Sequence, residues 1–239
     1  MPNPYFHFKQ FSICHDKCAM KVGTDGVLLG AWADTGNAAD ILDVGTGTGL
    51  IAIMLAQRST AKVDAVEIDE NAFSQAAENI RGCPWPERIH LIKSSFQEYS
   101  FVCGKTYDLI VSNPPYFKNQ YRPSEKSRAI ARHDDSLSLM DLVFHADLIL
   151  KPDGIISVII PTESIDIYRE FLHQKYLFVQ RVLYVMPSTG KPAKRILVEA
   201  GRRKSTIKKN SLAIDSGKRH QYTKEYIDLT REFYLIQGW

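Results

Sequence analysis

The stretch ADILDVGTGTGLIAIMLAQR, residues 39–58, has the pattern of a strand, a glycine-rich turn and a helix. An apolar run at 39–44 is followed by GTGTG at 45–49 and by helix-forming residues at 50–58. Glycines at such a junction allow a tight turn with backbone angles closed to other residues, and they let a ligand lie against bare backbone. The stretch therefore predicts a ligand-binding strand–helix unit of an α/β fold.

The rest of the chain continues to alternate between strand-like and helix-like segments. We predict strands at 39–44, 63–68, 89–93, 107–112, 154–160, 178–185 and 195–200, and helices at 50–58, 70–81, 139–150 and 162–173. This order predicts an α/β fold with a mainly parallel, twisted, seven-stranded sheet and helices on both faces. Residues 204–218 are polar and basic and predict an exposed loop, whereas 222–236 fit either a hairpin strand or a closing helix.

An acidic residue, Glu67, ends the second predicted strand, 18 residues beyond Gly49. A carboxylate at that position accepts hydrogen bonds from the two hydroxyls of a ribose. Two cofactor classes remain possible, a dinucleotide and S-adenosylmethionine. The narrow GTGTG spacing, with Asp43 just ahead of it, favours S-adenosylmethionine over the wider dinucleotide spacing.

A second motif, NPPY at 113–116, follows the fourth predicted strand directly, at the sheet edge where such folds bind ligands. An amino group on an aromatic ring is a poor nucleophile because its lone pair is delocalised. The side-chain oxygen of Asn113 and the backbone carbonyl of Pro114 can each accept one amino hydrogen and direct the lone pair at a methyl group. Proline fixes the backbone here, and Tyr116 can stack on a planar base. These residues predict methyl transfer to an amino nitrogen with no metal or general base.

The two motifs, in this order, resemble the amino-nitrogen branch of class I methyltransferases. The N-terminal stretches FKQF at 8–11 and HDKCAMKVGTDG at 15–26, together with ARHDDSLSL at 131–139, closely resemble the bacterial tRNA(Val) adenine-N6 methyltransferases. That family modifies the adenosine immediately 3′ of the anticodon. The resemblance covers most of residues 8–161 and implies the Rossmann-like class I methyltransferase fold.

The resemblance also implies roles for single residues. It places the methionine end of S-adenosylmethionine beside Lys21, Thr24 and Asp25, and the target adenine beside Asn113, Pro114 and Tyr116. The full predicted cofactor site adds Asp43, Gly45, Gly47, Gly49, Glu67, Ile68, Ser95, Phe96 and Asn113. One corner departs from related enzymes, which often bind the adenine amino group with an acid after the third strand. This chain has SSF at 94–96, so a serine contact and packing by Phe96 are expected there instead.

Basic and aromatic residues follow the NPPY motif and predict contact with RNA. Basic side chains would bind phosphates, and aromatic ones could stack on a splayed base. The predicted substrate-binding residues are Pro115, Phe117, Lys118, Arg122, Arg128 and Arg132. Excess positive charge gathers at 187–239, with 12 Lys and Arg against 5 Asp and Glu, while the rest has 18 against 22. We expect Arg202, Arg203, Lys204, Lys208 and Lys209 to extend this track.

Several classes of protein are disfavoured by the composition. No apolar run approaches the ~20 residues of a membrane span, no signal peptide is recognisable, and the four cysteines lack paired zinc-site spacing. We expect a cytoplasmic monomer without metal. It would be a single domain over 1–239, with an N-terminal cap at 1–35 and a basic C-terminal extension at 201–239.

Other interpretations stay open. A glutamine-N5 methyltransferase acting on a protein uses the same Asn-Pro-Pro-Tyr chemistry, although such enzymes typically carry a separate helical domain that has no room before Gly45. Guanine-N2 and DNA adenine targets are also possible. A non-catalytic RNA-binding module with this fold is disfavoured by the intact NPPY motif at 113–116.

Overall fold

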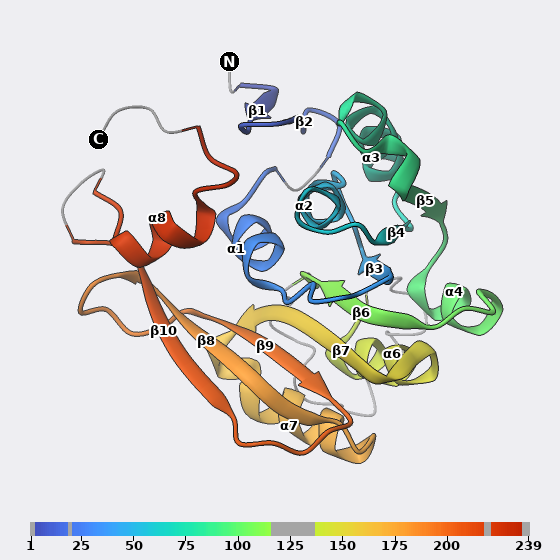
Figure 1. The fold of residues 1–239 in the computed structure, drawn as a ribbon, viewed down its shortest axis with the longest axis vertical. Helices are drawn as coiled ribbons and strands as arrows, with labels where there is room; N and C mark the ends of the chain where they lie inside the picture. The colour runs from blue at the N-terminus through green and yellow to red at the C-terminus, as the bar shows by residue number, and fades with distance from the viewer. Residues whose placement is uncertain (1–2, 19–20, 116–136, 218–220, 236–239) are drawn as a thin grey trace, which may run out of the picture.

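An eight-stranded sheet runs through the middle of the protein in a computed structural model that describes residues 3–18, 21–115, 137–217 and 221–235 (Figure 1). Its strand order is β10-β8-β9-β7-β6-β3-β4-β5, and only β9 runs antiparallel to its neighbours. The strands are β3 (Asp40–Val44), β4 (Lys62–Glu67), β5 (Ile89–Lys93), β6 (Tyr107–Ser112), β7 (Leu150–Pro161), β8 (Phe178–Ser188), β9 (Arg195–Gly201) and β10 (Lys208–Asp215).

Helices cover both faces of this sheet (Figure 1). One face carries α1 (Thr24–Trp32), α2 (Leu50–Arg58), α3 (Glu70–Gly82) and α8 (Lys224–Thr230). The other carries α4 (Phe96–Val102), α6 (Leu139–Ile149) and α7 (Ile165–Gln174). Two short 3₁₀ turns, η1 (Pro86–Arg88) and η2 (Thr162–Ser164), join helices to strands. A small hairpin of β1 (Tyr5–His7) and β2 (Ser12–Cys14) packs beside α3.

The two faces of the sheet bury two separate hydrophobic cores. Successive strand residues point to opposite faces. In β3, Ile41 therefore packs with α1 and α2, while Leu42 packs with α4 and α6. In β6, Leu109 faces the first core and Ile110 faces the second. Strands buried on both sides read as continuous apolar runs, which is why the sequence identifies them.

All seven predicted strands and all four predicted helices are confirmed, with boundaries that shift by a few residues. The predicted exposed loop at 204–218 is wrong, because Lys208–Asp215 forms β10 and adds an eighth, parallel strand. As an edge strand it buries little besides Leu212, so its sequence stays polar. The open choice for 222–236 resolves as a helix, α8. The hairpin, α1 and α4 were not predicted.

Within the ranges that the structure describes, no helix combines the length and the apolar composition needed to cross a membrane. In those same ranges, no three His, Cys, Asp or Glu side chains gather closely enough to hold a metal ion.

Candidate active site

The predicted site residues follow strands that end at the same edge of the sheet. Parallel strands bring their carboxyl ends together, and Val44 of β3 lies in register with Val66 of β4 and with Ser112 of β6. The glycine loop after β3, Glu67 at the end of β4 and Asn113 after β6 therefore begin side by side. We call this the carboxyl edge.

The glycine loop presents bare backbone at this edge. Gly45 and Gly47 have φ angles of +68° and +58°, which side chains rarely tolerate. A Cβ at either position would meet nothing within 4 Å, so open space lies above the loop. Gly49 differs, because it is buried and a Cβ there would touch Ile80 and Ala76 of α3. The first two glycines can face a ligand, while the third lets α2 and α3 approach each other.

Asp43 lies beneath this loop and shapes it. Its side chain is fully buried, and Oδ2 accepts hydrogen bonds from the Thr46 hydroxyl at 2.5 Å and from the Ala52 backbone N–H at 3.1 Å. The second contact caps the first turn of α2, whose N-cap Gly49 has no side chain. Burial raises the pKa of Asp43 to about 7, although those two hydrogen bonds oppose the shift. Asp43 therefore holds the conformation of the glycine loop and does not itself reach the open space above it.

Glu67 holds the loop from the neighbouring strand. One carboxylate oxygen accepts the Gly47 N–H at 2.8 Å, and the other accepts the Asp69 N–H at 2.9 Å. Each carboxylate oxygen can accept a further hydrogen bond, so two acceptor positions remain for hydroxyl groups. Its placement supports the predicted ribose contact.

The corner predicted to hold an adenine ring is built differently from the expectation. Phe96 is 4% exposed and packs in the core with its ring edge-on to His145, so little of it faces the edge. The Ser95 hydroxyl accepts the Glu98 N–H and caps α4. Ile68, directly after Glu67, is 42% exposed and provides the apolar surface at this corner.

The start of α1 also reaches the carboxyl edge. A Cβ at Gly26 would lie 3.2 Å from Leu50, so the first turn of α1 packs against the residue after the glycine loop. Asp25 forms an ion pair with Arg195 at the start of β9, with 2.7 Å between Oδ2 and Nε. Thr24 and Lys21 are exposed nearby in the chain. The pairing of Asp25 was not foreseen, because its partner lies 170 residues away.

Asn113, Pro114 and Pro115 leave the sheet at the end of β6. The ladder between β3 and β6 reaches the pair Val44–Ser112 and fixes this exit. The Ser112 hydroxyl adds a hydrogen bond to the Val44 carbonyl at 3.0 Å. Pro114 is buried, whereas Asn113 and Pro115 are half-buried. Asn113 therefore lies one strand away from the glycine loop, and part of it is accessible.

Comparisons with known proteins identify the family. A family model described as the methyltransferase small domain matches residues 20–181. A protein of Trichodesmium erythraeum named tRNA1(Val) (adenine(37)-N6)-methyltransferase is 49% identical over 96% of this chain and 97% of its own length. A protein of the same name from Bacteroides fragilis is 47% identical over 98% and 99%. The chain belongs to this methyltransferase family.

Solved structures share the fold of this methyltransferase. A predicted O-methyltransferase from Agrobacterium tumefaciens superposes with a TM-score of 0.64 at 20% identity, covering 87% of this chain and 96% of its own. A ribosomal protein L11 methylase from Lactobacillus delbrueckii gives 0.56 at 19% identity, covering 83% and 100%. At such identities the likeness concerns the fold alone, which is the class I methyltransferase fold that the sequence predicts.

The RNA-contact predictions for the methyltransferase divide into two groups. One group lies outside the described residues, namely Tyr116, Phe117, Lys118, Arg122, Arg128 and Arg132. The other, Arg202, Arg203, Lys204, Lys208 and Lys209, lies where β9 ends and β10 begins. Because Gly201 is in register with Ile155 and Phe178 near the starts of their strands, this group lies at the opposite, amino edge. It lies across the sheet from Asn113. That it extends the track stays a prediction, because residues 118–132 lie outside the described residues.

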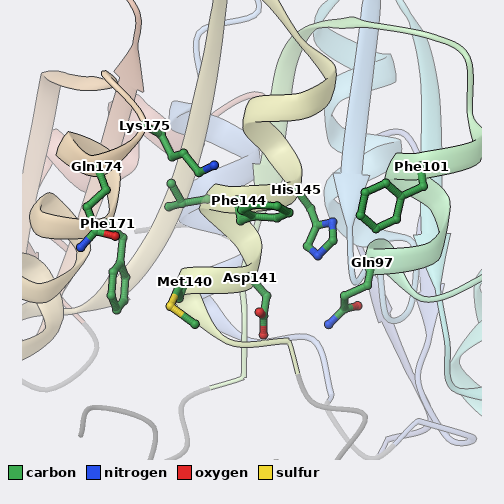
Figure 2. A pocket seen from close by; sticks show the side chains of 10 residues that line it. Gln97, Phe101, Met140, Asp141, Phe144, His145, Phe171, Gln174 and Lys175 are labelled. Atoms are coloured by element: carbon green, nitrogen blue, oxygen red, sulfur yellow. The ribbon is translucent and has the colours of Figure 1, made fainter. Parts of the chain in front are cut away.

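The methyltransferase also has a recess of about 530 Å³ on the face formed by α4, α6 and α7 (Figure 2). Figure 2 shows α6 in the middle, with Phe101 and Gln97 of α4 on one side and Phe171 and Gln174 of α7 on the other. His145 lies there among aromatic rings, and its Nδ1 pairs with the Ser100 hydroxyl at 2.7 Å. No predicted site residue lines this recess, so it is not the site described above.

Proposed function

We propose that this protein transfers a methyl group from S-adenosylmethionine to the exocyclic N6 of an adenine in tRNA, at position 37 of tRNA1(Val). The observation that carries the proposal is the position of Asn113 and Pro114, which follow β6 beside the glycine loop of β3. The names of the relatives supply the nucleoside and its position.

The residues at the carboxyl edge fit S-adenosylmethionine. Gly45 and Gly47 leave open space where a side chain would stand, Glu67 keeps two acceptor positions, and Ile68 exposes an apolar surface. Glu67 would bind the ribose hydroxyls, Ile68 and Ser95 would border the adenine, and Lys21 and Thr24 would lie near the methionine end. When bound, the cofactor supplies an electrophilic methyl group on a sulfonium.

The role of Asn113 and Pro114 is to orient the target nitrogen. The Asn113 side-chain oxygen and the Pro114 carbonyl each accept one hydrogen of the adenine amino group, which brings the nitrogen toward tetrahedral geometry and points its lone pair outward. The nitrogen becomes acidic only after it has gained the methyl group, and a proton then leaves it. Alignment of this kind can supply roughly 7–11 kcal/mol at best, so no buried base is required.

The decisive experiment combines a single substitution with a labelled methyl donor. We expect Asn113→Ala to lower kcat for tRNA methylation by about 100-fold or more, by analogy with the loss of one positioned hydrogen bond at a reacting group. The affinity for S-adenosylmethionine should stay within about twofold of the wild type, measured by isothermal titration calorimetry. A variant that loses cofactor affinity instead would contradict the assignment of Asn113 to the target base.

Ser112→Ala is the matched control for this experiment. It removes the neighbouring side chain and its hydrogen bond to the Val44 carbonyl, but not the acceptors of the amino group. We expect it to keep most of the activity, because the backbone ladder between β3 and β6 still holds the end of β6. Wild-type protein incubated with labelled donor and with tRNA, DNA or a protein extract tests the substrate class. Label found only in protein would favour glutamine methylation, and label nowhere would favour a binding module.

We also propose that residues 1–239 form one domain. The protein would act as a monomer in the cytoplasm, where tRNA is modified. Support for one domain comes from α1, which lies in the predicted N-terminal cap yet packs in the main core, and from β10, which extends the central sheet. Size-exclusion chromatography with light scattering tests the oligomeric state, and a monomer should give a mass near 27.1 kDa.

A further inference from the structure

Asn113 divides the carboxyl edge into a proposed cofactor half and a second half. Gly45 and Ser95 follow β3 and β5, and Glu67 ends β4, so the proposed cofactor site lies on one side of Asn113. On the other side the sheet continues through β7, β9 and β8. A large substrate whose base reaches Asn113 must lie over this second half, because the cofactor takes the first.

A hairpin loop at 188–195 projects from that second half. It joins β8, which runs toward the carboxyl edge, to β9, which runs back from it. Arg195 is in register with Pro161, three residues beyond the level at which Val158 meets Ser112. The loop therefore stands roughly 10 Å above the end of β6 and two strands, roughly 10 Å, to its side.

The backbone of this hairpin is firmly held. Gly190 has a φ of +78°, and the Lys191 N–H donates to the Ser188 carbonyl at 3.1 Å to close a tight turn. The Thr189 N–H donates to the Asp215 carbonyl of β10, and the Lys194 carbonyl accepts the Thr162 N–H of η2. A surface anchored to elements on both sides is already organised for binding, which lowers the entropy lost on association.

The two lysines of the hairpin form no ion pair with a described carboxylate. Lys191 and Lys194 are exposed, and neither forms an ion pair in the part of the chain that the structure describes. Arg195 neutralises Asp25, so that carboxylate does not offset the two lysines. Toward the amino edge, Arg202 pairs with Asp147 at 2.8 Å and Lys151 pairs with Asp40 and Asp108. Lys208 and Lys209 are exposed like the hairpin lysines, so their position in the fold separates them from Lys191 and Lys194.

We infer that the hairpin at 188–195 binds the phosphate backbone of the substrate RNA, with Lys191 and Lys194 as the contacting groups. The inference rests on the proposed function, because it takes the substrate to be tRNA. Two ammonium groups on a rigid turn bind phosphates as point charges, without reading sequence. They would hold the RNA stem while the target base reaches Asn113. The basic group at 202–209 would then make no comparable contact, because it lies across the sheet, roughly 20 Å from the hairpin.

The test compares two matched pairs of substitutions in the full chain. Lys191→Gln with Lys194→Gln should raise KM for tRNA about tenfold and leave kcat and the affinity for S-adenosylmethionine nearly unchanged. It should also lower the slope of log affinity against log salt by about one for each lysine, measured by fluorescence anisotropy. Lys208→Gln with Lys209→Gln removes the same charge at the amino edge and should change KM less than twofold.

The inference would be overturned if the hairpin pair bound tRNA like the wild type, or if the amino-edge pair lost as much affinity. Failure of the proposed function would look different, because the wild-type protein itself would then transfer no label to tRNA. Thermal melting of both variants checks folding, and Lys191→Glu with Lys194→Glu should deepen the loss of affinity in a folded protein.

Discussion

At the scale of single residues, Asp43 and Glu67 show how two carboxylates around one loop take different roles. Asp43 is wholly buried and accepts hydrogen bonds from Thr46 and from the first turn of α2. Its other oxygen, Oδ1, has no hydrogen-bond partner within the described residues. Glu67 spans two backbone N–H groups with separate oxygens. The first carboxylate shapes the loop, and we propose that the second also binds the cofactor.

The buried carboxyl of Asp43 makes a prediction about pH. Its folded pKa of about 7 lies above the unfolded value of about 3.9, so the folded state holds a proton that the unfolded state releases between those values. This contribution to stability is complete below about pH 4 and is lost as the pH rises through 7, at roughly 1.4 kcal/mol for each pH unit. Asp43→Asn cannot titrate and should flatten this decline.

Urea denaturation at several pH values between 4 and 8 measures the effect. Asp228→Asn is the control, since Asp228 is an exposed carboxyl of α8 whose pKa is lowered by a hydrogen bond from Lys224. It should leave the slope in this range unchanged. If the wild type and Asp43→Asn declined in parallel, the pKa of Asp43 would not be raised.

The sequence predicts which motifs meet at the candidate site, because their positions follow from the order of strands along the chain. GTGTG, the spacing to Glu67 and the NPPY motif are read along the chain, and they meet at one sheet edge. Contacts between residues that are far apart in the sequence cannot be predicted from these motifs. The pairing of Asp25 with Arg195 depends on how α1 lies against β9, and the burial of Phe96 depends on α6.

At the scale of elements, a helix or strand can be predicted from the sequence when its apolar residues follow a clear pattern. The strands of the sheet centre were predicted because they are apolar throughout. The helix α1 was missed because TDGVLLGAW is buried from Gly26 to Trp32, and a helix buried all round has no polar stripe. The strand β10 was missed for the opposite reason, because only one strand neighbours it and most of its side chains face water.

The packing of α1 on α2 predicts a sensitive position at Gly30. A Cβ at this position would lie 2.7 Å from the Met54 sulfur and 3.0 Å from its Cβ. Gly30→Val should therefore lower the free energy of unfolding by about 1–3 kcal/mol through overpacking. Adding Met54→Ala makes room, and the double variant should be more stable than the sum of the two single changes.

Gly82→Ala provides the comparison for this position. Gly82 ends α3, and a Cβ there would meet nothing within 4 Å. Chemical denaturation should find it at least as stable as the wild type. If Gly30→Val and Gly82→Ala lowered the free energy of unfolding equally, the loss of glycine's backbone freedom, rather than the contact with Met54, would account for the loss of stability.

At the scale of the whole molecule, β4 separates stability from function along one strand. Asp64, toward its amino end, accepts hydrogen bonds from Tyr107 at 2.5 Å, Lys105 at 2.8 Å and Tyr99 at 3.2 Å. Burial alone would raise the pKa of Asp64, but the donors outweigh it and lower the pKa below its usual value. Glu67, three residues on, reaches the proposed cofactor site.

The two carboxylates should respond differently to neutralisation. Asp64→Asn should lower the free energy of unfolding at pH 7 by about 1–3 kcal/mol and leave cofactor affinity unchanged. Because its folded pKa is lowered, the wild type should lose this same contribution as the pH falls below about 4. Glu67→Gln should weaken binding of S-adenosylmethionine about 10- to 100-fold, since hydrogen bonds to a charged acceptor contribute about 1.5–3 kcal/mol.

Calorimetric titration and urea denaturation of both variants distinguish these effects. Loss of cofactor affinity in Asp64→Asn, or normal affinity in Glu67→Gln, would contradict the division along β4.

The position of Lys208 and Lys209 on the outermost strand, β10, suggests a role for them that does not involve RNA. An edge strand offers unpaired N–H and C=O groups on which a second copy of the chain could assemble. Lys208 and Lys209 open this strand with two exposed positive charges, followed by Asn210 and Ser211. Exposed lysines on an edge strand disfavour such pairing, because an incoming strand would crowd and desolvate their charges. These residues are therefore placed to protect the protein against edge-to-edge aggregation.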